Sequence, residues 1–178
     1  METHIGVGVG KYIEKEFDNA KKSLYIATPT LTQNFAQKLI SMVESGIQIK
    51  IITSSRINPE TELSNVMLRK YIRNRQGSSE MAQISQKIVS QKEIPMIHVK
   101  LYIVDDECAI LGSVNLGENH FWKYAEYVWI IREPDLVNIA INDYEKLWAI
   151  CNDSEIEMSA TKRSLKDKIR KIKRKLKC

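Results

Sequence analysis

The sequence has few of the residues that cross-link small proteins and no apolar segment long enough to span a membrane. Its three cysteines, Cys108, Cys151 and Cys178, are odd in number and lack metal-like spacing, which argues against a disulfide framework. No apolar run approaches the roughly 20 residues that a membrane-spanning helix needs. A basic segment followed by an apolar one is also missing at the N-terminus, so we expect no secretory signal and a cytoplasmic location.

Basic residues outnumber acidic ones only at the C-terminal end of the chain. The 178 residues include 27 Lys or Arg and 22 Asp or Glu, a formal net charge of +5. Residues 159–178 contain ten basic residues and one acid, so by subtraction the rest has 17 basic and 21 acidic residues. We therefore expect a domain at 1–153 and a basic amphipathic helix or tail at 154–178.

The tail has a narrow apolar seam on a basic helix. Leu165, Ile169, Ile172 and Leu176 are spaced four, three and four residues apart, as on one side of a helix that begins near Thr161. Such a helix could pack against a second copy, dock on the domain, lie on an anionic membrane or follow a nucleic-acid backbone. The sequence does not decide between these.

Helices and strands alternate in the first half of the chain, which predicts an α/β fold with a β-α-β unit. Apolar periodicity predicts the following elements: helices at 9–22, 33–45, 62–75, 80–91 and 134–150, and strands at 23–28, 47–53, 97–104, 108–111 and 124–131.

The stretch HVKLYIVDDECAILGSVN holds the most informative residues. Side chains on a strand alternate between its two faces, so His98 and Lys100 share a face. A turn is expected from Asp105, and Ser113 and Asn115 alternate on the returning strand. An imidazole, a cation and two neutral hydrogen-bonding groups are therefore expected near one end of a sheet.

These residues resemble the HKD motif of the phospholipase D superfamily, H-x-K-x4-D-x6-G-S-x-N. All six fixed identities occur at the family spacing: His98, Lys100, Asp105, Gly112, Ser113 and Asn115. The resemblance covers about residues 9–147, including GIQIKIITSSR, and is to single-motif members such as the small bacterial Nuc-type endonucleases. It implies a mixed β-sheet flanked by helices on both faces, here with a basic C-terminal helix.

The resemblance also implies roles for individual side chains. His98 would attack phosphorus and form a phosphohistidine. Glu126 matches the acid downstream of G-S-x-N and would hold the His98 imidazole. Lys100 and Asn115 would bind the non-bridging oxygens, assisted by Ser113.

Three further residues qualify this assignment. Asp105 is an odd number of residues from His98, so on a strand its side chain would point to the opposite face. We therefore expect a structural acid that fixes the turn or a neighbouring strand. Tyr124 stands where family members often have asparagine, which bears on substrate shape. His120 could be a further catalytic histidine, but a histidine on a surface loop is the favoured interpretation.

The leaving oxygen needs a proton, and the best donor is a second imidazole. Because the chain has one motif, we expect a twofold homodimer that brings both His98 side chains to one pocket. No metal and no cofactor are expected.

Several basic residues could line a groove that binds a polyanion. For any one of them, a position on a solvent-exposed helix face is an equally good interpretation. The candidates are Arg56, Arg69 and Arg73 in the middle of the chain, and Lys162, Arg163, Arg170, Lys171 and Arg174 in the tail.

Three functions are compatible with this sequence. The favoured one is a metal-independent nuclease of low specificity that cuts DNA or RNA. The second is a phospholipid hydrolase or transferase of the cardiolipin type at a membrane surface. The third is a non-catalytic nucleic-acid-binding module that keeps the fold.

Overall fold

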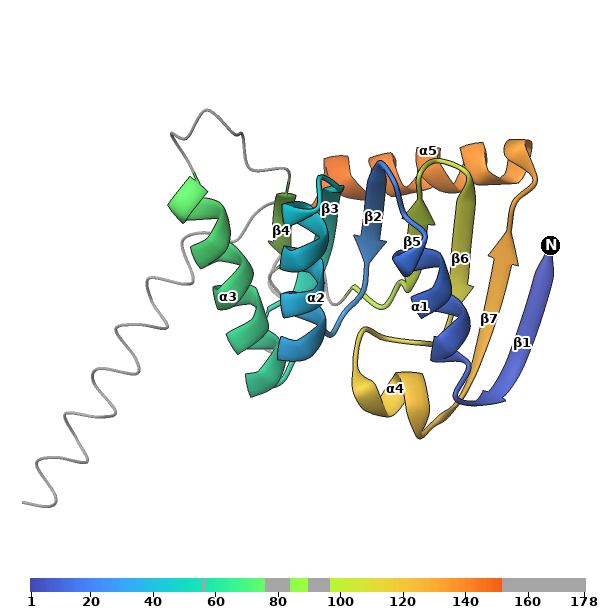
Figure 1. Cartoon of the computed structure of the whole chain (residues 1–178), viewed down its shortest axis with the longest axis horizontal. Coiled ribbons are helices and arrows are strands. Elements are labelled where there is room, and N and C mark those ends of the chain that lie inside the picture. Colours follow the sequence, from blue (N-terminus) through green and yellow to red (C-terminus); the bar gives the residue numbers. More distant parts are fainter. Residues whose placement is uncertain (56, 76–83, 90–96, 152–178) are drawn as a thin grey trace, which may run out of the picture.

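The computed structural model describes residues 1–55, 57–75, 84–89 and 97–151, which form a mixed seven-stranded sheet with helices on both faces (Figure 1). The strand order is β1-β7-β6-β5-β2-β3-β4, with β2, β3 and β4 parallel and the other neighbours antiparallel. The strands are β1 (Glu2–Val7), β2 (Ser23–Ala27), β3 (Gln48–Ser54), β4 (Ile84–Val89), β5 (Leu101–Val104), β6 (Cys108–Gly112) and β7 (Ala125–Ile131).

The sheet divides the hydrophobic core into two layers, each covered by helices. Side chains of α1 (Gly10–Asp18), α2 (Gln33–Glu44), α3 (Pro59–Arg75) and α4 (Glu118–Trp122) meet one face of the sheet, where Phe17 and Leu39 are buried. On the other face α5 (Pro134–Ile150) contributes Val137 and Tyr144. The expected α/β architecture with helices on both faces is confirmed.

The motif lies on a central hairpin made by β5 and β6. Asp105 and Asp106 have φ angles of 56° and 59°, and the Glu107 N–H donates to the Val104 carbonyl at 3.0 Å. Two successive left-handed residues make a type I′ turn, which suits the twist of a hairpin. The expected turn is therefore confirmed, and it brings residues 98–100 and 113–115 to the same end of the hairpin.

Most expected elements are present, with a few corrections. The helix expected at 80–91 is wrong, because residues 84–89 form β4 in parallel with β3. The strand expected from residue 97 begins only at Leu101, so His98 and Lys100 lie in the segment that leads into β5. The strand β1 and the short helix α4 were not expected.

The face of the sheet that α5 covers is partly open. Ile5 pairs with Tyr127, and Leu111 with Trp129, so these side chains project on the side of Ile131, which belongs to the α5 layer. They are nevertheless exposed, Ile5 by 81% and Trp129 by 39%. We call this the uncovered sheet face: Ile5, Val7, Leu111, Tyr127 and Trp129.

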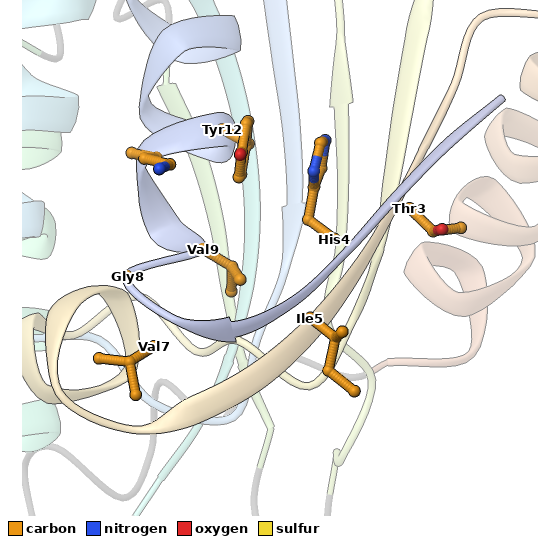
Figure 2. A pocket seen from close by; sticks show the side chains of 8 residues that line it. Thr3, His4, Ile5, Val7, Gly8, Val9 and Tyr12 are labelled. Carbon is orange, nitrogen blue, oxygen red and sulfur yellow. The ribbon is translucent and has the colours of Figure 1, made fainter.

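A hollow of 340 Å³ lies between β1 and the start of α1 (Figure 2). The His4 ring stacks on Tyr12 at a centroid distance of 3.5 Å, and Figure 2 shows Ile5 on the opposite side of the strand. The stack ties β1 to α1. None of the motif residues lines this hollow.

Several expectations concern residues outside the described part of the chain. They are the polyanion contacts at Arg56, Lys162, Arg163, Arg170, Lys171 and Arg174, and the tail helix itself. No helix within the described residues has the length and apolar character needed to span a membrane.

Candidate active site

His98 and Lys100 form a close pair at the start of the motif. The Lys100 Nζ atom lies 3.1 Å from the His98 Nε2 atom and donates to the His98 carbonyl at 2.9 Å. An ammonium has only donors, so the Nε2 atom must supply the lone pair, as in a neutral imidazole. His98 is exposed whereas Lys100 is 8% exposed, so the imidazole is open to solvent beside a largely buried cation.

The environment of Lys100 alters its proton affinity. Burial lowers the pKa of the ammonium below its ordinary value, and the charge of Glu126 offsets part of this effect. A cation held with little water around it attracts an anion more strongly than a solvated one. Lys100 is therefore suited to hold a phosphate oxygen next to His98.

Glu126 on β7 is buried at the same end of the sheet. It accepts a hydrogen bond from the Ser113 hydroxyl, and its Oε1 atom lies 2.6 Å from Nδ1 of His120. The Tyr127 N–H in turn donates to Ser113 Oγ at 3.0 Å. Among the described residues the hydrogen bonds of Glu126 thus go to Ser113 and His120, and the expected bond to His98 is absent.

Asn115 connects the motif to the end of β2. Its Nδ2 atom lies 3.1 Å from Nε2 of His120, and the buried Thr28 hydroxyl donates to its Oδ1 atom at 3.5 Å. The Tyr102 hydroxyl donates to the Val114 carbonyl at 2.7 Å. These bonds fix the loop that carries Ser113 and Asn115, and Thr28 and Tyr102 are site residues that the sequence analysis missed.

The position of His120 corrects the expectation of a surface histidine. It belongs to α4, and its neighbour Phe121 is fully buried with its ring 4.4 Å from that of Phe35. A Cβ at Gly10 would come within 2.4 Å of the Phe121 side chain, so the glycine permits this close packing. Phe121 anchors α4 and leaves His120 facing Glu126 with 29% of its side chain exposed.

Asp105 lies at the far end of the hairpin, in the turn. Its carboxylate accepts hydrogen bonds of 2.7–2.9 Å from the backbone N–H groups of Lys21, Lys22 and Ser23. Burial raises the pKa of this carboxyl, but the three N–H groups lower it by more, to below its ordinary value. Asp105 therefore ties the hairpin turn to the start of β2.

Two expected polyanion contacts lie on α3. Arg69 is only 7% exposed, so it offers almost no surface to a nucleic acid, contrary to expectation. Arg73 is exposed and remains available.

The residues brought together can perform nucleophilic chemistry on a phosphate. The site contains an exposed imidazole, a buried ammonium, an amide, a hydroxyl and a second imidazole bound to a carboxylate. The imidazole can attack, while the cation and the neutral donors can stabilise developing charge.

Comparisons with known proteins agree with this arrangement. The family model described as "Cardiolipin synthase, PLD-like domain" matches residues 13–148. Cardiolipin synthase 1 of Bacillus anthracis is 26% identical over 156 residues, which are 85% of this chain and 28% of that protein. The chain thus spans little more than a quarter of this relative.

Solved structures show the same fold. Nuc from Salmonella typhimurium, a phospholipase D family member, matches with a TM-score of 0.68 and 19% identity, covering 85% of this chain and 97% of its own. NucT from Helicobacter pylori matches with a TM-score of 0.63 and 18% identity, covering 85% and 98%.

Proposed function

The chain belongs to the phospholipase D-like domain family, within a superfamily of phosphodiesterases, and we propose that it is a metal-independent nuclease that cuts DNA or RNA. The observation that carries this proposal is the exposed His98 imidazole, with Nε2 3.1 Å from the buried Lys100 ammonium. The imidazole provides a nucleophile, and the cation attracts the phosphodiester to it.

The reaction would proceed through a covalent intermediate. The Nε2 lone pair of His98 attacks phosphorus, the bond to the leaving oxygen breaks, and a phosphohistidine forms. Water then attacks the same phosphorus and releases His98. Two easier steps replace one difficult displacement at an anionic centre.

Lys100 and Asn115 would stabilise the charge that builds on the non-bridging oxygens. Both side chains are 8% exposed and held by neighbours, Lys100 by His98 and Asn115 by Thr28. Because they are already oriented, little reorganisation is needed when a phosphate arrives. Ser113 assists as a hydroxyl held beside Glu126.

A polynucleotide is favoured over a lipid by the extent of the structural likeness. The fold match extends over 97% of Nuc and 98% of NucT, whereas the sequence match covers only 28% of cardiolipin synthase 1. The second candidate, a phospholipid hydrolase or transferase at a membrane surface, draws support from that relative and from the family description.

We also propose that the active form is a homodimer joined through the uncovered sheet face. Isolated apolar side chains on a surface are ordinary, but a contiguous group marks an interaction site. The backbone N–H of Tyr127 donates to Ser113 of the site, so the strand that carries this face also borders the motif loop. A twofold contact there would bring two sites to one groove, as suits a long polyanionic substrate.

A panel of substrates tests the function. Labelled single-stranded DNA, duplex DNA, RNA and cardiolipin vesicles are each incubated with the protein in the presence of EDTA, and His98→Asn serves as the matched control. We expect cleavage of a polynucleotide by the wild type and none by His98→Asn. Turnover of cardiolipin alone would establish the lipid alternative, and activity that needs a divalent ion would refute the mechanism.

A further inference from the structure

We propose that His120 is the proton carrier of this site, so that each chain supplies both the nucleophile and the acid–base group. This inference rests on the proposed function and deepens it. It replaces the expectation that the second imidazole comes only from a partner protomer. Of the three histidines in the chain, His4 is stacked on Tyr12 beside β1, and His98 and His120 belong to the site.

The bond to Glu126 gives His120 the geometry of a general acid–base residue. The Nδ1 atom lies 2.6 Å from a carboxylate oxygen that is itself buried. A carboxylate in this position fixes the tautomer with hydrogen on Nδ1 and stabilises the imidazolium when the other nitrogen gains a proton. The Nε2 atom is therefore the one that exchanges protons.

Nε2 is directed toward the group that binds substrate. It lies 3.1 Å from Nδ2 of Asn115, whose amide donates to it in the neutral form. The His120 side chain is 29% exposed, so a substrate on Asn115 can reach it. Lys100 contacts His98, and the charge of Glu126, the carboxylate that binds His120, opposes the lowering of the Lys100 pKa by burial, so both imidazoles belong to one site.

The proton balance follows from these positions. In the first step the lone pair of His98 forms the bond to phosphorus, the phosphorus–oxygen bond breaks, and the leaving oxygen takes the proton from Nε2 of His120. In the second step the neutral His120 removes a proton from water, whose oxygen attacks phosphorus while the bond to His98 breaks. His120 is protonated again at the end, and no other reactant is needed.

Substrates that differ only in the leaving group separate this role from a structural one. With bis(p-nitrophenyl) phosphate the leaving group departs as a stable anion and needs no proton. With a dinucleotide or DNA it departs as an alkoxide and does. In His120→Asn we expect cleavage of the dinucleotide to fall by about 10²–10⁴-fold, the usual contribution of general acid–base catalysis.

The same variant should still release one equivalent of p-nitrophenol per site in a burst and then turn over slowly, since only the second step needs a base. His4→Asn is the matched control and should cleave both substrates like the wild type. A burst reduced as strongly as dinucleotide cleavage, or dinucleotide cleavage that stays at the wild-type rate, would overturn the assignment of His120. His98→Asn tests the proposed function separately, because it should abolish the burst as well; a retained burst would refute the nucleophile.

Discussion

The Nζ atom of Lys100 lies 3.1 Å from the Nε2 atom of His98, two residues apart on a segment that leads into the central strand β5. The ammonium can donate toward a lone pair on this nitrogen, so the two groups lie side by side at the end of the sheet that carries the motif. A phosphate that binds Lys100 therefore meets the nucleophilic nitrogen of His98.

Removing the cation tests its role in binding the transition state. Lys100→Ala should lower kcat by about 10²–10³-fold, the usual cost of losing one such donor. Lys100→Arg keeps the charge and should retain more activity than the alanine variant. Initial rates on a labelled oligonucleotide provide the measurement, and similar rates for Lys100→Ala and the wild type would contradict this role.

The pH dependence of activity reports on the same residue. Burial lowers the pKa of Lys100, so the ammonium loses its proton at a lower pH than an ordinary lysine, and activity should decline on the alkaline side. An arginine stays protonated throughout, so Lys100→Arg should lose this alkaline decline. Identical alkaline limbs in the two proteins would show that another group titrates there.

Asp105 should contribute to stability in a pH-dependent way. Its pKa is depressed in the folded state, so its contribution is present above the unfolded pKa and is lost as the pH falls through the folded pKa. Asp105→Ala should lower the free energy of unfolding at neutral pH by about 1–3 kcal/mol, because three backbone N–H groups lose their acceptor.

Urea unfolding at neutral and at acid pH measures this difference. Asp106→Asn is the control, since Asp106 shares the left-handed turn geometry with a φ of 59°. It should change stability little. A loss for Asp105→Ala that stays constant down to acid pH would contradict the linkage.

The uncovered sheet face should hold the homodimer together. Trp129→Glu adds a charge to the centre of that face and should raise the dimer dissociation constant by at least about tenfold. Ile139→Glu changes an even more exposed apolar residue on α5, 55% against 39% for Trp129, and should have no effect. Sedimentation velocity distinguishes the species, and a wild type that remains monomeric at assay concentrations would refute the dimer.

The sequence predicted the parts of the site that depend on local geometry. The alternation of a strand-like segment was enough to pair His98 with Lys100, and the identities around Asp105 were enough to predict a turn. The position of His120 depends on Phe121 packing against Phe35, a contact that no periodicity reveals. The signal that the sequence does offer is the aromatic pair Phe121 and Trp122 shortly after Asn115.

The prediction of a helix at residues 80–91, where the structure has β4, was wrong because of a contact between distant parts of the chain. Ile84 and Ile88 alternate as in a strand, but the polar Gln86 between them faces the core. Its buried side chain donates from Nε2 to the side-chain Oδ1 atom of Asn65 on α3 at 3.0 Å. A buried glutamine obscures the apolar pattern, and its partner becomes known only when the fold is known.

Detection of a covalent phosphohistidine tests the central claim most directly. The protein is mixed with substrate, quenched under alkaline denaturing conditions within one turnover and analysed by peptide mass spectrometry. The account predicts a phosphorus–nitrogen adduct on His98 that is absent from His98→Asn. An adduct on another residue, or full activity in His98→Asn, would contradict it.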